Sequence, residues 1–574
     1  MNGSDKGTGE ADGTYAYTAH LDTFAADNLP PRDEWPDFRF ELPELRYPER
    51  LNCGEALLDS QVDRGHGARR AVGAMVGEQP VFATYDALLA QTNRIANVLV
   101  NELGLVPGNR VLLRAPNNPM MAACWLAVLK AGLIAVPTMP LLRAKELNQI
   151  VVKARVATAL CDSALADEIS QCLDPSSEHY ASGLMRVVLF NGGPSARTAH
   201  EATLEALCEK QPTVFANIDT ARDDVCMLAF TSGTTGEPKA TMHFHRDVMA
   251  MCDTFSRYVL KPGPDDVFIG TPPLAFTFGL GGMLCFPLSV GGATFLVERT
   301  TPELLLELIG RAGATIVFTA PTFYRHMALL LQAGMRKSAV ATLRKSVSAG
   351  EALPDATRQL WKSTTGIEMI DGIGGTEVMH IYISAAGGDV RRGAIGKVVP
   401  GFDAMIVDDA MQPMPIGEVG RLALKGPTGC RYLSDSRQKE YVKNGWNLPG
   451  DAFTMDADGY FFYQARTDDM IVSAGYNIAG PEVESAMLAH HADAECGVVG
   501  VPDDARGYLV KAFVVLKEGH SPSHELVIEL QTFVKTTVAP YKYPRQIEFV
   551  DVLPRTETGK LQRFRLRRKE EATL

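Results

Sequence analysis

The stretch "AFTSGTTGEPKA", Ala229–Ala240, is a run of hydroxyl residues and glycines between an apolar segment and a Pro-Lys pair. Its hydroxyl groups, glycine amides and Lys239 are hydrogen-bond donors or positive charges, which suit a polyphosphate. A Walker loop would need Gly at position 238 and Ser or Thr at position 240, but this chain has Pro238 and Ala240. The stretch therefore predicts phosphate binding by a loop of a different kind.

Short apolar runs alternate with helical patterns from the N-terminal region to about residue 400. We expect buried strands at 110–116, 158–162, 186–192, 226–230, 315–321 and 345–351. This alternation predicts an α/β fold with parallel-type sheets that are flanked by helices. Ligands of such sheets bind at the loops after the carboxyl ends of the strands. Those loops begin here at Thr231, Pro321 and Gly350.

A chain of 574 residues is expected to form more than one domain. We expect a disordered tail over residues 1–25 and a large N-terminal domain over 26–466. The part of this domain from about 395 to 466 is rich in turns and β-type patterns. Residues 467–574 are predicted to form a small α+β domain.

The composition excludes several classes of protein. A formal net charge of −12 argues against nucleic-acid binding. The 10 cysteines form no CxxC pair and no Cys/His cluster, which indicates free thiols in a reducing, cytoplasmic setting rather than disulfides or a zinc site. The uncharged stretch 270–297 is long enough to span a bilayer, but its glycines and proline favour a buried helix followed by a strand. We therefore expect no membrane association.

Four further stretches accompany the first. They are "SAGEALP" (348–354), "DGIGGTEVMH" (371–380), "NGWNLPGDAF" (444–453) and "LPRTETGKLQRF" (553–564). Each alone is a weak signal, but their order and separations are specific. From about residue 50 to 565 the chain resembles the adenylate-forming (acyl-CoA synthetase) superfamily. The resemblance implies a two-step, AMP-forming ligase that uses ATP, Mg²⁺ and CoA.

The resemblance also implies roles for individual residues. The phosphate loop corresponds to Thr231, Ser232, Gly233, Thr234, Thr235, Gly236 and Lys239. The residues around the adenine and ribose correspond to Gly350, Glu351, Ala352, Asp371, Gly372, Thr376, Asp451 and Arg466. Glu377 corresponds to the magnesium ligand and Lys560 to the mobile catalytic lysine, while Thr231 is the third expected catalytic residue. Where the family usually has an aromatic residue before Gly-x-Thr-Glu, this chain has Gly372 or Ile373.

In the second half-reaction of the family, the C-terminal domain rotates about a hinge aspartate, here Asp468. The rotation removes Lys560 and brings in a turn that is represented by Ser473, Ala474 and Gly475. This turn borders the path of the pantetheine arm and favours CoA as the acceptor.

Within the superfamily, "PPLAFTFGLGG", "YVKNGWNLPGD" and "SAGYNIAGPEVE" look most like benzoate-type CoA ligases, and 2-aminobenzoate (anthranilate)–CoA ligases are the closest likeness. An aryl carboxylic acid is therefore the expected substrate. The implied acyl-binding residues are Ala275, Phe276, Phe278, Gly279, Phe323, Ile373 and Gly374. We expect His380 to be structural rather than catalytic.

Three alternatives remain at the level of sequence. In the first, the substrate is a bulkier carboxylic acid from a biosynthetic pathway. In the second, the acyl group passes to a carrier protein instead of CoA. In the third, the chain is a nucleotide-binding sensor without catalytic activity. A sensor would be expected to lose Lys239, Glu377 or Lys560, and all three are present. The sequence does not distinguish a monomer from a homodimer.

Overall fold

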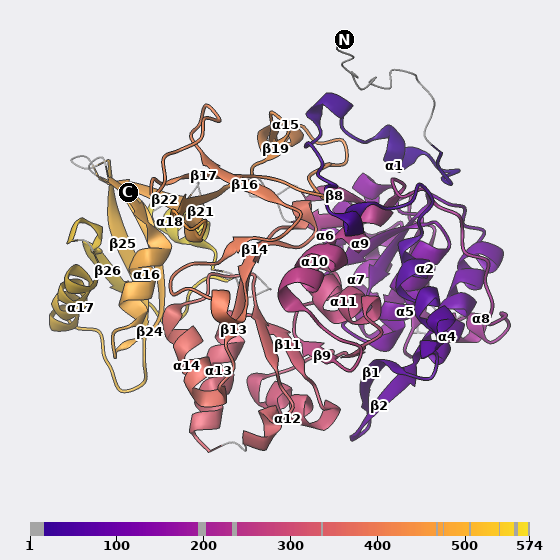
Figure 1. The fold of residues 1–574 in the computed structure, drawn as a ribbon, viewed down its shortest axis with the longest axis horizontal. Coiled ribbons are helices and arrows are strands. Elements are labelled where there is room, and N and C mark those ends of the chain that lie inside the picture. The colour runs from indigo at the N-terminus through magenta and orange to yellow at the C-terminus, as the bar shows by residue number, and fades with distance from the viewer. Residues whose placement is uncertain are drawn as a thin grey trace, which may run out of the picture.

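The computed structural model describes residues 17–192, 202–231, 238–334, 337–466, 469–473, 476–503, 507–538, 540–555 and 561–571. These residues form four sheets with helices packed around them. Figure 1 shows the N-terminal half at one end of the molecule and the C-terminal part, from β22 onward, at the other end.

The first sheet holds the strand that leads into the phosphate-type loop. Its order is β6 (Arg186–Phe190), β5 (Thr158–Asp162), β3 (Arg110–Arg114), β4 (Ile134–Thr138), β7 (Val225–Thr231) and β8 (Lys239–Phe244). All pairs except β7 with β8 are parallel. The helices that follow these strands include α5 (Pro119–Lys130), α6 (Ala144–Ala154) and α7 (Ala166–Leu173). Asn118 caps α5 by accepting the backbone N–H of Met121, and most of that helix is buried because nearly all its residues are apolar.

The second sheet positions three neighbouring loops. Its order is β15 (Lys397–Val398), β14 (Ile381–Ala385), β13 (Met369–Gly374), β12 (Lys345–Ser348), β11 (Ile316–Thr319), β9 (Val267–Gly270), β10 (Ala293–Phe295), β1 (Arg70–Val76) and β2 (Gln79–Thr84). Strands β11, β12 and β13 run parallel to one another, so the loops after them meet at one edge. The long helices around this sheet are α4 (Tyr85–Asn97), α12 (Pro302–Ala312), α13 (Pro321–Gln332) and α14 (Asp355–Thr365). The six predicted strands and the predicted α/β fold are confirmed.

The turn-rich region forms a third, antiparallel sheet. Its strands are β16 (Asp403–Val407), β17 (Gly420–Lys425), β18 (Val442–Lys443), β19 (Trp446–Asn447), β20 (Asp451–Met455) and β21 (Phe461–Arg466). The residues after 469 form the fourth sheet from β22 (Met470–Ser473), β23 (Tyr476–Ala479), β24 (Asp493–Asp503), β25 (Gly507–Leu516) and β26 (Gln546–Phe549). Helices α16 (Gly480–Leu488) and α17 (His524–Thr537) pack on this sheet around a separate hydrophobic cluster, and α18 (Arg563–Glu571) ends the described chain.

Residues 17–25 fall within the segment that was expected to be a disordered tail. Leu21 and Asp22 donate backbone hydrogen bonds to the carbonyl of Pro107, and Asp22 forms an ion pair with Arg110. The backbone N–H of Ala19 donates a hydrogen bond to the carboxylate of Asp224. These contacts make residues 17–25 part of the folded structure.

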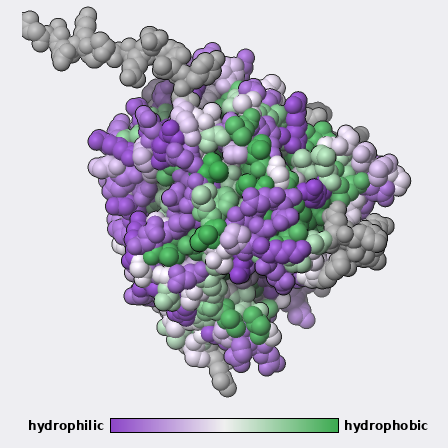
Figure 2. Space-filling view, turned by 90° about the vertical axis from the view of Figure 1, so that its right-hand side faces the viewer, coloured by the Kyte–Doolittle hydropathy of each residue, from purple (hydrophilic) through white to green (hydrophobic). Residues whose placement is uncertain are grey.

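The uncharged stretch 270–297 folds as α10 (Thr277–Leu280), η7 (Gly281–Cys285) and α11 (Phe286–Ser289) before β10, as its glycine and proline content predicted. Within the described part of the chain, every helix is too short or too polar to cross a bilayer. On the side shown in Figure 2, hydrophilic surface is interrupted by small apolar patches.

Candidate functional site

A cavity of about 600 Å³ lies between the loops of the second sheet and the C-terminal part of the chain. From the large part it is lined by the starts of α13 and α14, by Gly350–Pro354 and by 371–374, together with Asp451 and Arg466. From the C-terminal part it is lined by α16, the start of β24, Arg555, Leu561 and Arg563. Segments far apart in the sequence thus converge on one space.

The turn after β12 supplies one wall of this cavity. Gly350 has a φ of +93°, a left-handed conformation that a residue with a Cβ would adopt only with strain. This turn places Glu351 and Ala352 at the cavity, and Glu351 Oε1 lies 3.9 Å from Arg555 Nη1 of the C-terminal part. The expected adenine-side residues are therefore adjacent to the C-terminal part.

Asp371, on β13, lies beside that turn with only 4% of its surface exposed. Burial raises the pKa of its carboxyl to about 7, although Arg358 Nη2 at 3.6 Å and the backbone N–H of Gly372 act in the opposite direction. A buried carboxyl with a pKa near neutrality is able to donate as well as accept a hydrogen bond.

Asp451 and Arg466 face each other across β20 and β21. Arg466 Nη1 lies 3.2 Å from Asp451 Oδ1 and donates to the carbonyl of Pro449 at 2.8 Å. Asp451 is 6% exposed and opens onto the cavity. The arrangement presents one carboxylate, fixed by a guanidinium, to any ligand in this space.

Glu377 is part of η9 (Thr376–Val378), and the hydroxyl of Tyr432 donates a 2.7 Å hydrogen bond to its Oε1. Lys239 Nζ donates to the same phenolic oxygen at 3.1 Å and lies 3.9 Å from Glu377 Oε1. Tyr432 pairs with Thr241 of β8, so its position is fixed next to the strand that begins at Lys239. Tyr432 is not among the site residues expected from the sequence, because a lone tyrosine carries no spacing signal.

The phosphate-type loop is described only at its two ends. Thr231 and Lys239 pair across β7 and β8, which places the two ends of the loop side by side. The buried Oγ1 of Thr231 has no hydrogen-bond partner among the described residues. Ser232, Gly233, Thr234, Thr235 and Gly236 lie outside the described residues.

The expected acyl-binding residues are only partly brought together. Ile373 and Gly374 line the cavity, and Phe278 packs against Phe318 and His380 with ring centroids 5.5 and 5.8 Å apart. Burial among these aromatic rings lowers the pKa of His380 to about 3, so this imidazole is neutral.

The other acyl-binding candidates do not line this cavity. Ala275 is buried, Phe276 is half-buried before α10, and Gly279 lies against the carbonyls of Pro272 and Pro273. Phe323 packs from α13 against the cluster beneath the second sheet.

The C-terminal part reaches the site through several contacts. Arg325 of α13 donates a 3.1 Å hydrogen bond to the carbonyl of Ala494 at the start of β24. Arg555 and Leu561, which bracket the expected catalytic lysine in the sequence, line the cavity. Ser473 is buried at the end of β22. Lys560, Asp468, Ala474 and Gly475 lie outside the described residues.

Several side chains of the site fit a magnesium ion and a nucleotide. Glu377 is a hard oxygen donor of the kind that Mg²⁺ prefers, and Lys239 beside it would contact phosphate. The Thr231 hydroxyl, which has no hydrogen-bond partner in the described part of the chain, and the fixed Asp451 carboxylate also fit a nucleotide. A second set, Cys53, Cys226 and His245, is buried with its ligand atoms within 4.8 Å of one another. There the His245 Nδ1 already accepts the backbone N–H of Cys53, which fits a core contact.

Comparison with known proteins agrees with this geometry. The family described as "AMP-binding enzyme" matches residues 59–432, and its C-terminal domain matches residues 482–560. The chain belongs to the AMP-binding enzyme family. A benzoate–CoA ligase of Thauera aromatica is 34% identical over 531 residues, which cover 92% of this chain and 97% of that protein.

Two solved structures of CoA ligases are similar to the structure of this chain. The anthranilate CoA ligase AuaEII in complex with anthranoyl-AMP has a TM-score of 0.85 and 31% identity, over 93% of this chain and 99% of that one. A benzoate CoA ligase from Burkholderia xenovorans LB400 has a TM-score of 0.80 and 29% identity, over 90% of this chain and 100% of that one. ATP and CoA are substrates of this family, and the expected superfamily and fold are confirmed.

Proposed function

We propose that this protein is an ATP-dependent aryl carboxylate–CoA ligase. In the first step the carboxylate attacks the α-phosphate of ATP, which yields an aryl-adenylate and releases pyrophosphate. In the second step the thiol of CoA attacks the activated carbonyl, which yields aryl-CoA and releases AMP and a proton. The observation that carries the proposal is the convergence of Glu351, Asp371 and Asp451 with the C-terminal part on one 600 Å³ cavity.

The chain supplies donors for both ends of ATP. The adenosine would lie against the turn from Gly350 to Ala352 and against 371–374, where Asp451 would accept hydrogen bonds from the ribose hydroxyls. Thr231, Lys239 and the loop between them would hold the leaving phosphates. Fixed donors of this kind stabilise charge that develops in the transition state. Lys560 would bridge the α-phosphate and the attacking carboxylate.

Magnesium, bound through Glu377, would neutralise phosphate charge in the first step. The role proposed for Tyr432 is to orient the carboxylate of Glu377. Burial raises the pKa of the Tyr432 hydroxyl well above its usual range, and the negative charge of Glu377 adds a smaller increase. The phenol therefore stays protonated and donates. The same oxygen accepts from Lys239, so one side chain fixes both groups.

The proposed domain division has a large domain over 26–466 and a mobile domain over 467–574. The contacts between Arg325 and Ala494, and between Glu351 and Arg555, support an arrangement suited to the first step. Rotation about Asp468 would then replace Lys560 with the turn Ser473–Gly475, past which CoA would enter.

The proposed acid is a small aryl carboxylate such as 2-aminobenzoate or benzoate. The names of the relatives support this choice. Phe276, Phe278 and Phe323 are proposed to contact the aromatic ring of the acid. All 10 cysteines are free and buried, which supports action in a reducing compartment such as the cytoplasm.

The test is a panel of carboxylic acids, scored by ATP- and CoA-dependent thioester formation together with AMP release. We expect 2-aminobenzoate and benzoate to be among the best substrates. An apolar pocket alone would separate them by only about 10–200-fold, whereas a hydrogen bond to the ortho amino group would separate them further. Efficient use of palmitate with 2-aminobenzoate inert would contradict the aryl assignment. A carrier protein that is acylated in preference to CoA would contradict the assigned acceptor.

A further inference from the structure

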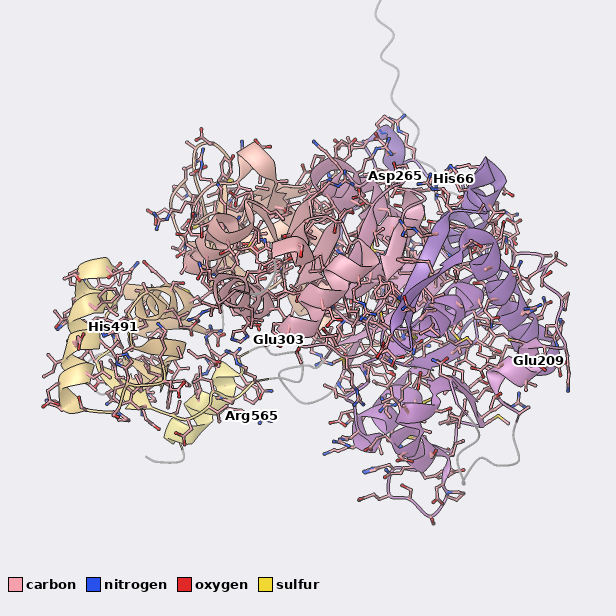
Figure 3. The ribbon with its side chains drawn as sticks, turned by 90° about the horizontal axis from the view of Figure 1, so that it is seen from below. His66, Glu209, Asp265, Glu303, His491 and Arg565 are labelled. Carbon is pink, nitrogen blue, oxygen red and sulfur yellow. The ribbon has the colours of Figure 1, made fainter. Side chains whose placement is uncertain are left out.

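Four side chains from three separate segments meet on the C-terminal part of the molecule. His490 and His491 follow α16, His520 follows β25, and Glu529 lies on α17. The rings of His490 and His491 have centroids 4.3 Å apart, and those of His491 and His520 are 5.1 Å apart. His490 Nε2 lies 3.2 Å from Glu529 Oε1. Figure 3 labels His491 at the end of the molecule formed by the C-terminal part.

The spacing of these donors suits a metal ion. The ligand atoms of His490, His491 and Glu529 all lie within 4.8 Å of one another. Imidazole nitrogen and carboxylate oxygen bind Zn²⁺ at about 2.0–2.2 Å, which places two ligands of a tetrahedral ion about 3.3 Å apart. His490 Nε2 and Glu529 Oε1 are already about this far apart, at 3.2 Å, and a ring nitrogen of His491 lies within 4.8 Å of both.

We propose that His490, His491 and Glu529 bind a divalent transition metal ion such as Zn²⁺, with His520 next to them as a further imidazole donor. This site is separate from the cavity described above and does not depend on the proposed function. His491 and Glu529 are exposed, so the ion has access from solvent and water can fill the remaining coordination position.

Metal binding would also change a contact within the turn. His490 Nδ1 accepts the backbone N–H of Ala492 at 3.3 Å, so the ring proton resides on Nε2. An ion on Nε2 would move that proton to Nδ1 and break the hydrogen bond from Ala492. The affinity for the ion would be lower by the free energy of this one weak hydrogen bond.

Ala494, two residues after Ala492, is the residue whose carbonyl accepts the hydrogen bond from Arg325. The site therefore lies close to the contact between the two parts of the chain.

The experiment is a calorimetric titration of Zn²⁺ into the full-length protein, without a histidine tag, treated with chelator and free of nucleotide. We expect one Zn²⁺ per chain, and we expect His491→Ala and Glu529→Gln each to weaken binding by at least about tenfold. Both positions are exposed, so the variants should fold, which thermal unfolding would verify.

His524→Ala is the matched control, because His524 is an exposed histidine on the same helix as Glu529 and outside the cluster. This variant should bind Zn²⁺ as the unaltered protein does. Absence of Zn²⁺ binding by the unaltered protein would overturn the proposal. Equal affinity in the unaltered protein, His491→Ala and Glu529→Gln would also overturn it.

Discussion

Tyr432 donates a 2.7 Å hydrogen bond to Glu377, although 55 positions separate the two residues in the chain. The phenol also accepts from Lys239, so a single hydroxyl holds the proposed magnesium ligand and a proposed phosphate ligand in one arrangement. Outer-shell partners of this kind orient a metal ligand without touching the ion.

Replacing Tyr432 by Phe should raise the Mg²⁺ concentration needed for half-maximal acyl-adenylate formation by about 10–100-fold. The ring would still fill its buried site, while Glu377 would lose its donor. The measurement is a Mg²⁺ titration of pyrophosphate release without CoA. Tyr460→Phe is the control, because it removes a 3.0 Å phenolic hydrogen bond to Asp389 away from this cluster. An unchanged Mg²⁺ requirement in Tyr432→Phe would show that the phenol does not orient Glu377.

Part of the fold and of the candidate site can be predicted from the sequence. Strands β3, β5, β7 and β12 were predictable because short apolar runs alternate with helical patterns, and the loops after such strands are where ligands bind. Asp451 and Arg466 were both expected on the nucleotide side of the site, and the structure pairs them across β20 and β21.

Contacts that depend on tertiary packing were not predictable. Lys239 and Tyr432 lie 193 positions apart, and Arg325 and Ala494 lie 169 apart. Neither pair has a local period or spacing that would connect them. The raised pKa of Asp371 likewise depends on burial by distant segments, which its own stretch of sequence does not encode.

Asp371 should make stability depend on pH. Its pKa rises from an ordinary value of 3.8 to about 7 on folding, so between these values the folded state holds a proton that the unfolded state has lost. Stability therefore falls as pH rises from about 4 to about 7 and is constant above that range.

Relative to the unaltered protein, Asp371→Asn should gain stability over this range, by up to about 4 kcal/mol at 1.36 kcal/mol per pKa unit. Denaturant unfolding of both proteins at pH 4.5, 6 and 8 measures the difference. Other groups such as Asp493, with a pKa also raised to about 7, are present in both proteins and cancel. A stability difference that does not vary with pH would contradict the raised pKa.

Lys560 should serve only the first half-reaction. Loss of one charged donor to the reacting phosphate should lower the rate of acyl-adenylate formation by about 10²–10³-fold in Lys560→Ala. The same variant should convert supplied aryl-adenylate and CoA into thioester at nearly the unaltered rate. Asp468→Pro should show the opposite pattern, because a fixed φ would hinder the hinge. Equal loss of both half-reactions in folded Lys560→Ala would argue against domain rotation.

The contact between Arg325 and Ala494 should favour the arrangement in which the C-terminal part closes the cavity. A hydrogen bond from a charged group contributes about 1.5–3 kcal/mol, and this one is only partly buried, so the lower value applies. If the first step uses this arrangement, as proposed, Arg325→Ala should lower the rate of acyl-adenylate formation by about tenfold. Thioester formation from supplied aryl-adenylate should be unchanged, because the proposed rotation separates Arg325 from Ala494 in the second step.

Single-turnover measurements of each half-reaction would separate these effects. Arg311→Ala is a suitable control, because the contacts of Arg311 within the described part of the chain are with Glu307 of α12 and the carbonyl of Glu78, both in the large part. That variant should leave both rates unchanged. A decrease of both rates in Arg325→Ala would indicate a general loss of structure, and a decrease of thioester formation alone would mean that this contact belongs to the second step.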